Sequence, residues 1–141
     1  MRRLILLICL IACAKAAPPA TPAAFCYALD WSDSTWAPLL PGTVRLVEAP
    51  DTLLPANYPY RLLRPVNQTD TLGWAHLMNA WWMQGPSDSL LMILDGVDSG
   101  WRVSLHRFGD SLTGVATYRS TNDQQAAMLV RGHRFACPND S

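Results

Sequence analysis

Alternation of apolar and polar residues predicts β-strands in the second half of the chain. The segment 101–108 carries apolar side chains at every second position and polar side chains between them, as in a strand with one buried face. Gly109-Asp110 follows and is typical of a tight hairpin turn. Segment 111–118 continues the alternation, and segments 89–94 and 125–137 add strands on either side.

Turn residues divide the first half of the chain into short segments of the same kind. Segment 73–84 is compatible with a strand or a helix, and its three tryptophans favour a strand. The other strands predicted here are 25–30, 43–49 and 58–64. Together these segments predict an all-β, antiparallel domain of about eight strands.

The first residues have the pattern of an export signal. Met1-Arg2-Arg3 is cationic, and the run 4–12 is apolar. Nine apolar residues span only about 13 Å as a helix, too little for a hydrocarbon core of roughly 30 Å. We therefore expect 1–12 to be a signal peptide and not a transmembrane helix.

The signal ends in Leu10-Ile11-Ala12-Cys13, which resembles a bacterial lipobox. This resemblance implies cleavage before Cys13, diacylation of that cysteine and attachment to a membrane, with the outer membrane or the periplasmic face as the site. The alternative is ordinary cleavage after Ala16 or Ala17, which would release a soluble secreted or periplasmic protein.

The segment 13–24 then combines the lipidated cysteine with a tether rich in proline and alanine. Residues 25–141 are long enough for one domain with its own core. The chain has 11 basic and 11 acidic residues, and removal of Arg2 and Arg3 leaves 9 basic residues and a net charge of −2. This balance provides no basic surface for nucleic acid.

Cys26 and Cys137 lie near the two ends of the predicted domain. An exported domain meets an oxidising compartment, so we expect them to form a disulfide. Eight strands in an up-and-down order can close into a small barrel, in which the first and last strands are neighbours. The alternative is a β-sandwich, in which the disulfide would link two sheets.

Two residues give the chain a resemblance to the calycin group, which includes the lipocalins. That group has a tryptophan near the first strand and an arginine on the last strand that covers one end of the barrel. Trp31 or Trp36 matches the first, and Arg134 matches the second. Arg134 falls on the inward face of its strand, with Met128 and Val130. The Gly-x-Trp of the group is absent.

The chain is also similar to uncharacterised bacterial lipoproteins with Cys-Tyr-x-Leu near the start and a Gly-Asp-Ser-Leu hairpin. Here these are residues 26–29 and 109–112. No activity comes with this similarity.

No set of residues predicts catalysis or metal binding. The three histidines, His76, His106 and His133, fall in separate segments, and no pattern places them together. The chain lacks a phosphate loop and the common hydrolase and metalloprotease motifs. We therefore predict no catalytic residues, metal site or cofactor, and a protein that is not an enzyme.

Six tryptophans are many for this length. One interpretation is core and edge packing, another is a surface for a protein partner, and a third is a ligand pocket. The residues predicted to line such a pocket are Trp74, Met78, Trp82, Trp101 and Tyr118, with Arg134 as a further candidate. The sequence thus favours an exported lipoprotein that binds a small apolar ligand or lipid in a barrel. The alternative is a structural or protein-interaction module of the cell envelope.

Overall fold

The computed structural model describes residues 21–67 and 72–138. This part of the chain is all-β apart from one short 3-10 helix. The elements are β1 (Ala24–Trp31), η1 (Ala37–Leu39), β2 (Thr43–Pro50), β3 (Arg61–Arg64), β4 (Asn79–Gln84), β5 (Ser89–Asp95), β6 (Ser99–Phe108), β7 (Ser111–Ser120) and β8 (Gln125–Phe135).

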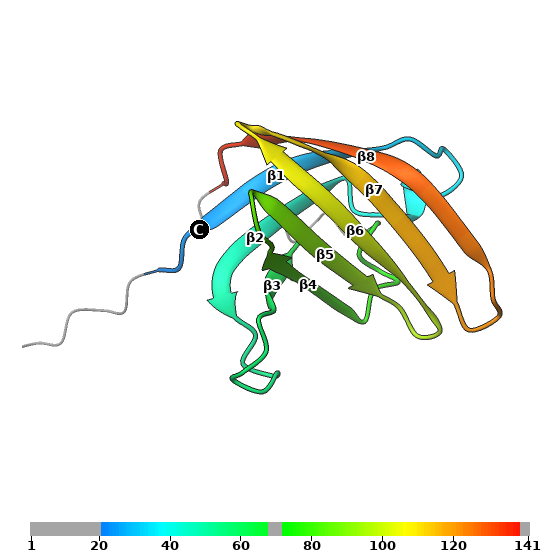
Figure 1. Cartoon of the computed structure of the whole chain (residues 1–141), viewed down its shortest axis with the longest axis horizontal. Helices are drawn as coiled ribbons and strands as arrows, with labels where there is room; N and C mark the ends of the chain where they lie inside the picture. Colours follow the sequence, from blue (N-terminus) through cyan, green and yellow to red (C-terminus); the bar gives the residue numbers. More distant parts are fainter. Residues whose placement is uncertain (1–20, 68–71, 139–141) are drawn as a thin grey trace, which may run out of the picture.

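The eight strands form one closed antiparallel barrel in sequence order (Figure 1). Each strand pairs with the next, and β8 returns to pair with β1, with Cys26 opposite Phe135. This closure confirms the predicted barrel and not the sandwich. It is compatible with a lipocalin-like fold.

The first half of the chain differs from its predicted elements. The third strand begins at Arg61 and not at residue 58, because Pro59 has no N–H to donate to a neighbouring strand. The fourth begins at Asn79 and not at residue 73. Residues 72–76 form turns, and Gly73 lies so close to the Leu40 carbonyl that a Cβ there would overlap it.

Large apolar side chains fill the interior of the barrel. Trp82, Tyr27 and Met92 are among the largest side chains that are fully buried, and they belong to one continuous core. Gly114 faces the same interior, and a Cβ at this position would overlap the Ser104 carbonyl. The small residue is therefore required where β6 and β7 approach each other most closely.

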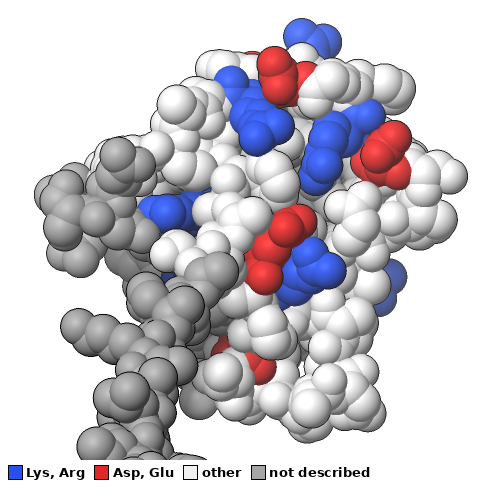
Figure 2. Space-filling view, turned by 90° about the vertical axis from the view of Figure 1, so that its left-hand side faces the viewer, with Lys and Arg blue, Asp and Glu red and all other residues white. Residues whose placement is uncertain are grey.

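The barrel has two ends with different connections. At the proximal end, β1 begins at Ala24 and β8 ends at Phe135; at the distal end, β1 ends at Trp31 and β8 begins at Gln125. The proximal end lies on the left in Figure 1. Figure 2 views that side and shows basic and acidic side chains interspersed over it. The described residues contain no helix with the length and hydropathy needed to cross a membrane.

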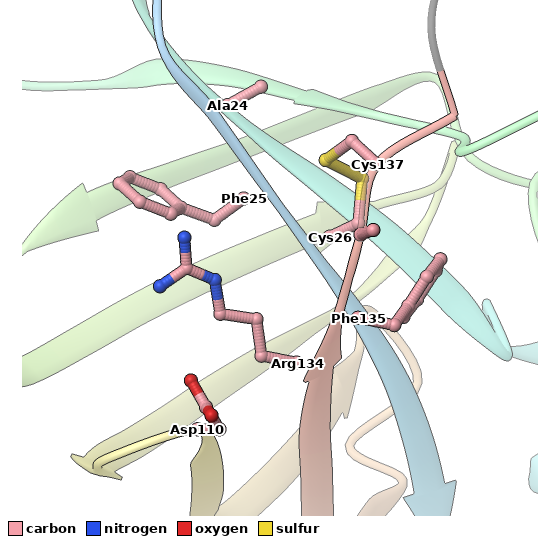
Figure 3. Close-up of a pocket in the computed structure, with 8 residues that line it drawn as sticks. Ala24, Phe25, Cys26, Asp110, Arg134, Phe135 and Cys137 are labelled. Carbon is pink, nitrogen blue, oxygen red and sulfur yellow. A yellow bond between two sulfur atoms is a disulfide. The ribbon is translucent and has the colours of Figure 1, made fainter.

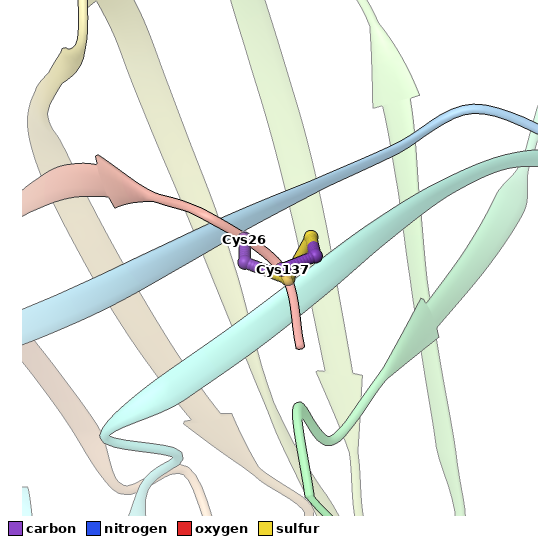
Figure 4. Close-up of a disulfide and its surroundings, with 2 residues drawn as sticks. All are labelled: Cys26 and Cys137. Carbon is purple, nitrogen blue, oxygen red and sulfur yellow. A yellow bond between two sulfur atoms is a disulfide. The ribbon is translucent and has the colours of Figure 1, made fainter. Parts of the chain in front are cut away.

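The predicted disulfide is present at the proximal end. Cys26 and Cys137 are joined, with their Cα atoms 5.2 Å apart. Cys137 lies two residues after the end of β8, so the bridge ties the chain that follows the last strand to the first strand (Figure 4). A disulfide of this kind indicates an oxidising compartment outside the cytoplasm.

Candidate ligand-binding site

The ladder between β3 and β4 has the fewest paired residues of any ladder in the barrel. Only Arg61 with Trp82 and Leu62 with Trp81 are in register there, whereas β6 and β7 are paired from Ser99 to Phe108. Beyond Leu62 the ladder stops while both strands continue. The two strands therefore leave a gap toward the distal end.

A pocket of about 240 Å³ lies at this gap. We call it the seam pocket. It is formed by Asp51, Leu53, Leu62, Leu63, Arg64, Pro65, Trp74, Leu77, Met78, Asn79, Ala80 and Trp81. Most of these residues are apolar by type, as is typical of clefts used for small molecules, but polar atoms contribute more of the exposed pocket surface than apolar atoms do.

The loop between β2 and β3 supplies one wall of the seam pocket through Asp51. The Asp51 carboxylate accepts a hydrogen bond from the Leu53 backbone N–H and one from the Trp81 indole N–H, both at 2.9 Å. These two bonds, in that order, lower the pKa of Asp51 below its usual value of 3.8, and the charge of Arg64 adds to the effect. The carboxylate thus stays ionised and holds the loop against β4.

Trp74 is half-buried in the turns before β4 and packs against the barrel core. Its indole Nε1 is shielded from solvent, and no partner for it is found among the described residues. A buried donor without a partner costs about 1–3 kcal/mol.

The structure divides the predicted pocket residues among separate places, and two of them line the seam pocket. Trp74 and Met78 both line the seam pocket, and Met78 is 65% exposed at its edge. Trp82 is buried in the barrel core. Its indole N–H donates to the Val47 carbonyl, and Arg61 lies 5.2 Å from its ring.

Trp101 and Tyr118 lie together at the distal end, away from Trp74 and Met78. Their ring centroids are 5.1 Å apart, and Trp36 contacts both rings. Trp101 is buried and Tyr118 half-buried. This aromatic cluster packs onto the core and covers the barrel interior from that end.

Arg134 lies at the proximal end of β8, where it is exposed, on the same side of the strand as the buried Val130 and Gly132. Its guanidinium is 4.8 Å from the ring of Phe25, and that of Arg107 is 5.6 Å from the same ring. Figure 3 shows Arg134 extended toward Phe25, with Asp110 nearby. A second pocket, of about 300 Å³, lies here beside the disulfide. Trp31 is near the distal end, so it does not meet Arg134.

The histidines are separate and exposed. His76 lies in the turns before β4, whereas His106 and His133 point outward from β6 and β8. No group of three or more metal-ligating side chains occurs in residues 21–67 and 72–138. The predicted lipidation site, Cys13, lies outside the described residues.

The chain was compared with protein-family models, with curated proteins and with solved structures. None of the three comparisons gives a match. The resemblance to calycins therefore rests on the closed barrel and on the placement of Arg134 over the proximal end.

Sequence reasoning missed the contribution of Asp51 and Leu53 to the site. Both belong to a loop without apolar periodicity, and the strand that they face begins only at Asn79. The one local signal is Asp51-Thr52-Leu53, in which an aspartate can accept a hydrogen bond from the N–H two residues later.

Proposed function

We propose that this protein binds a small apolar molecule in the seam pocket, outside the cytoplasm. The observation that supports this most is the gap between β3 and β4, where a pocket lies whose lining residues are mostly apolar by type. The core inside the barrel is packed with large side chains, which favours a binding position in the wall of the barrel over one along its axis.

We further propose that the protein is a lipoprotein held in the cell envelope through Cys13. The chain enters β1 at Ala24, so an anchor on Cys13 would attach at the proximal end. Mass spectrometry of the intact protein from the producing cells tests this, since diacylation adds the mass of the lipid to Cys13.

A second candidate function is a structural or interaction module of the envelope. Val115 and Leu129 face each other across β7 and β8 and are 42% and 59% exposed on the outer surface. Exposed apolar pairs of this kind suit a protein contact. Mass spectrometry under native conditions separates the two candidates, because it shows either a retained small molecule or a bound protein.

Binding in the seam pocket is tested with N-phenyl-1-naphthylamine, whose fluorescence rises in apolar surroundings. We expect Met78→Asp to weaken binding of this probe about tenfold, because a charge at the pocket edge must be desolvated when the probe enters. Met78 is exposed, so the substitution should leave the fold intact.

Val97→Asp is the matched control. Val97 is 79% exposed and lies in the turn between β5 and β6, outside the pocket lining. Equal loss of probe binding in both variants would place the probe elsewhere. No binding to the unaltered protein would refute the proposed function.

A further inference from the structure

Three aromatic side chains lie side by side on the outside of the barrel, where the loop between β2 and β3 meets β4. The ring of Tyr60 is 6.0 Å from that of Tyr58 and 6.0 Å from that of Trp81, and the ring planes are inclined by 40° and 33°. We call these three residues the aromatic row. They do not belong to the barrel core, so packing of the interior does not explain why they are aromatic.

The aromatic row borders open surface. Tyr58 and Tyr60 line a pocket of about 490 Å³, whose other lining residues are Glu48, Pro50, Pro59, Arg61 and Gln84. Trp81 lines the seam pocket. Tyr58 is 49% exposed, and Tyr60 and Trp81 are half-buried. A molecule in solution can therefore reach the row from either pocket.

Polar side chains share the pocket with Tyr58 and Tyr60. Glu48 and Arg61 form an ion pair at 3.7 Å, and their side chains are 41% and 40% exposed, so both still reach solvent. A carboxylate accepts hydrogen bonds, a guanidinium donates them, and the amide of Gln84 does both. The pocket thus offers donors and acceptors beside two aromatic rings.

A sugar ring matches this combination of groups. Its hydroxyl groups donate and accept hydrogen bonds, and its C–H hydrogens, which carry partial positive charge, pack against the electron-rich face of an aromatic ring. A proline-rich peptide also packs on aromatic side chains, but proline has no N–H to donate to the Glu48 carboxylate. The polar groups of the pocket therefore favour a carbohydrate.

From these contacts we propose that the aromatic row and its pocket bind a carbohydrate chain. Its sugar rings lie against Tyr58, Tyr60 and Trp81, while Glu48 and Arg61 bond its hydroxyl groups. This inference goes beyond the proposed function, because it assigns a different class of ligand to a different surface. The two sites share Trp81 as a lining residue.

Titration of the disulfide-bonded protein with chitotetraose, cellotetraose and maltotetraose tests the proposal, since these probes differ in linkage and substituents. We expect at least one of them to bind with a Kd of about 1 mM or tighter. The NMR signals of its C–H protons should move upfield, because these protons lie over aromatic rings. Failure of all three probes to bind at about 10 mM overturns the proposal.

Tyr58→Ala should weaken binding of the sugar about two- to tenfold, the range of one aromatic contact. Phe108→Ala is the matched control, because Phe108 is 67% exposed at the end of β6 and lies outside the pocket lining. It should bind the sugar as the unaltered protein does. Equal binding by Tyr58→Ala and the unaltered protein would place the sugar elsewhere and overturn the proposal.

Two further measurements separate the alternatives. N-phenyl-1-naphthylamine should still bind to Tyr58→Ala, because Tyr58 does not line the seam pocket, so failure of this proposal is distinguishable from failure of the proposed function. The second probe is a peptide with the sequence of residues 16–22, which contains three prolines. If it binds, Tyr58→Ala weakens its binding and no sugar binds, the row belongs to a proline-rich segment and the carbohydrate proposal is overturned.

Discussion

At the residue scale, Asp51 is the group that connects a loop to the barrel wall. Its carboxylate is held by the Leu53 N–H and the Trp81 N–H, and its pKa lies below 3.8 for that reason. An acid whose pKa is lower in the folded than in the unfolded protein stabilises the fold at pH values above its unfolded pKa. This contribution is lost as the pH falls through the lower, folded pKa.

We therefore expect Asp51 to release Trp81 only in strong acid. The NMR shift of the Trp81 indole N–H, followed from about pH 5 down to about pH 2, should change with a midpoint below the ordinary aspartate pKa of about 3.9. The transition should be absent in Asp51→Asn, where the side chain does not titrate. A midpoint at or above the ordinary value would contradict the hydrogen bonding described for this carboxylate.

Single residues also show where sequence reasoning succeeds. The side of β8 on which Arg134 lies was predictable because exposed and buried side chains alternate from Ala127 to His133, and Arg134 continues that order at the exposed end of the strand. Trp74 was predictable as a pocket residue only because it is a tryptophan. Its partnerless N–H depends on the path of turns 72–76, and turns have no periodicity from which a direction can be read.

At the element scale, the strands differ in how well they are paired. The predicted bounds of β5, β6, β7 and β8 lie within two residues of those observed, because regular alternation continues along each of them. β3 and β4 are shorter than predicted. β3 begins only after Pro59, and β4 begins only after the turns in which Gly73 lies against Leu40. The contact of Gly73 with Leu40 is tertiary and is not visible in the sequence pattern.

This unequal pairing predicts unequal opening of the barrel. We expect backbone amides of β3 and of the first half of β4 to exchange with solvent hydrogen about tenfold or more faster than amides of β6 and β7, because local opening follows the weakest contacts. Hydrogen exchange followed by NMR or mass spectrometry measures this.

A ligand bound in the seam pocket should slow exchange in β3 and β4 alone. Amides on the far strands, such as those of β7, provide the internal control. Equal protection of the backbone amides in all strands would contradict the prediction that the pairing of β3 with β4 is the least stable in the barrel.

At the scale of the whole molecule, the disulfide links the two ends of the chain that forms the barrel. It joins residues separated by 111 positions, and closure of so long a loop stabilises the fold by about 5 kcal/mol in the chain-entropy treatment. The pairing was predictable because Cys26 and Cys137 are the two cysteines of the predicted domain, and an exported domain meets an oxidising compartment.

We expect Cys137→Ser to lower the free energy of unfolding by up to about 5 kcal/mol. Guanidinium denaturation of the oxidised protein and of the variant measures the difference. The unaltered protein in a reducing buffer is the control and should unfold at the same denaturant concentration as the variant. Identical midpoints for the oxidised protein and the variant would show that the bridge contributes nothing.

The position of the disulfide also sets the path of mechanical load. Cys26 lies two residues after the start of β1, and Cys137 lies two residues after the end of β8. Tension applied between the two ends of the chain therefore passes from one sulfur to the other and bypasses the strands between them. Pulled in this way, the oxidised protein resists as a covalent chain, and only reduction makes the barrel bear the force.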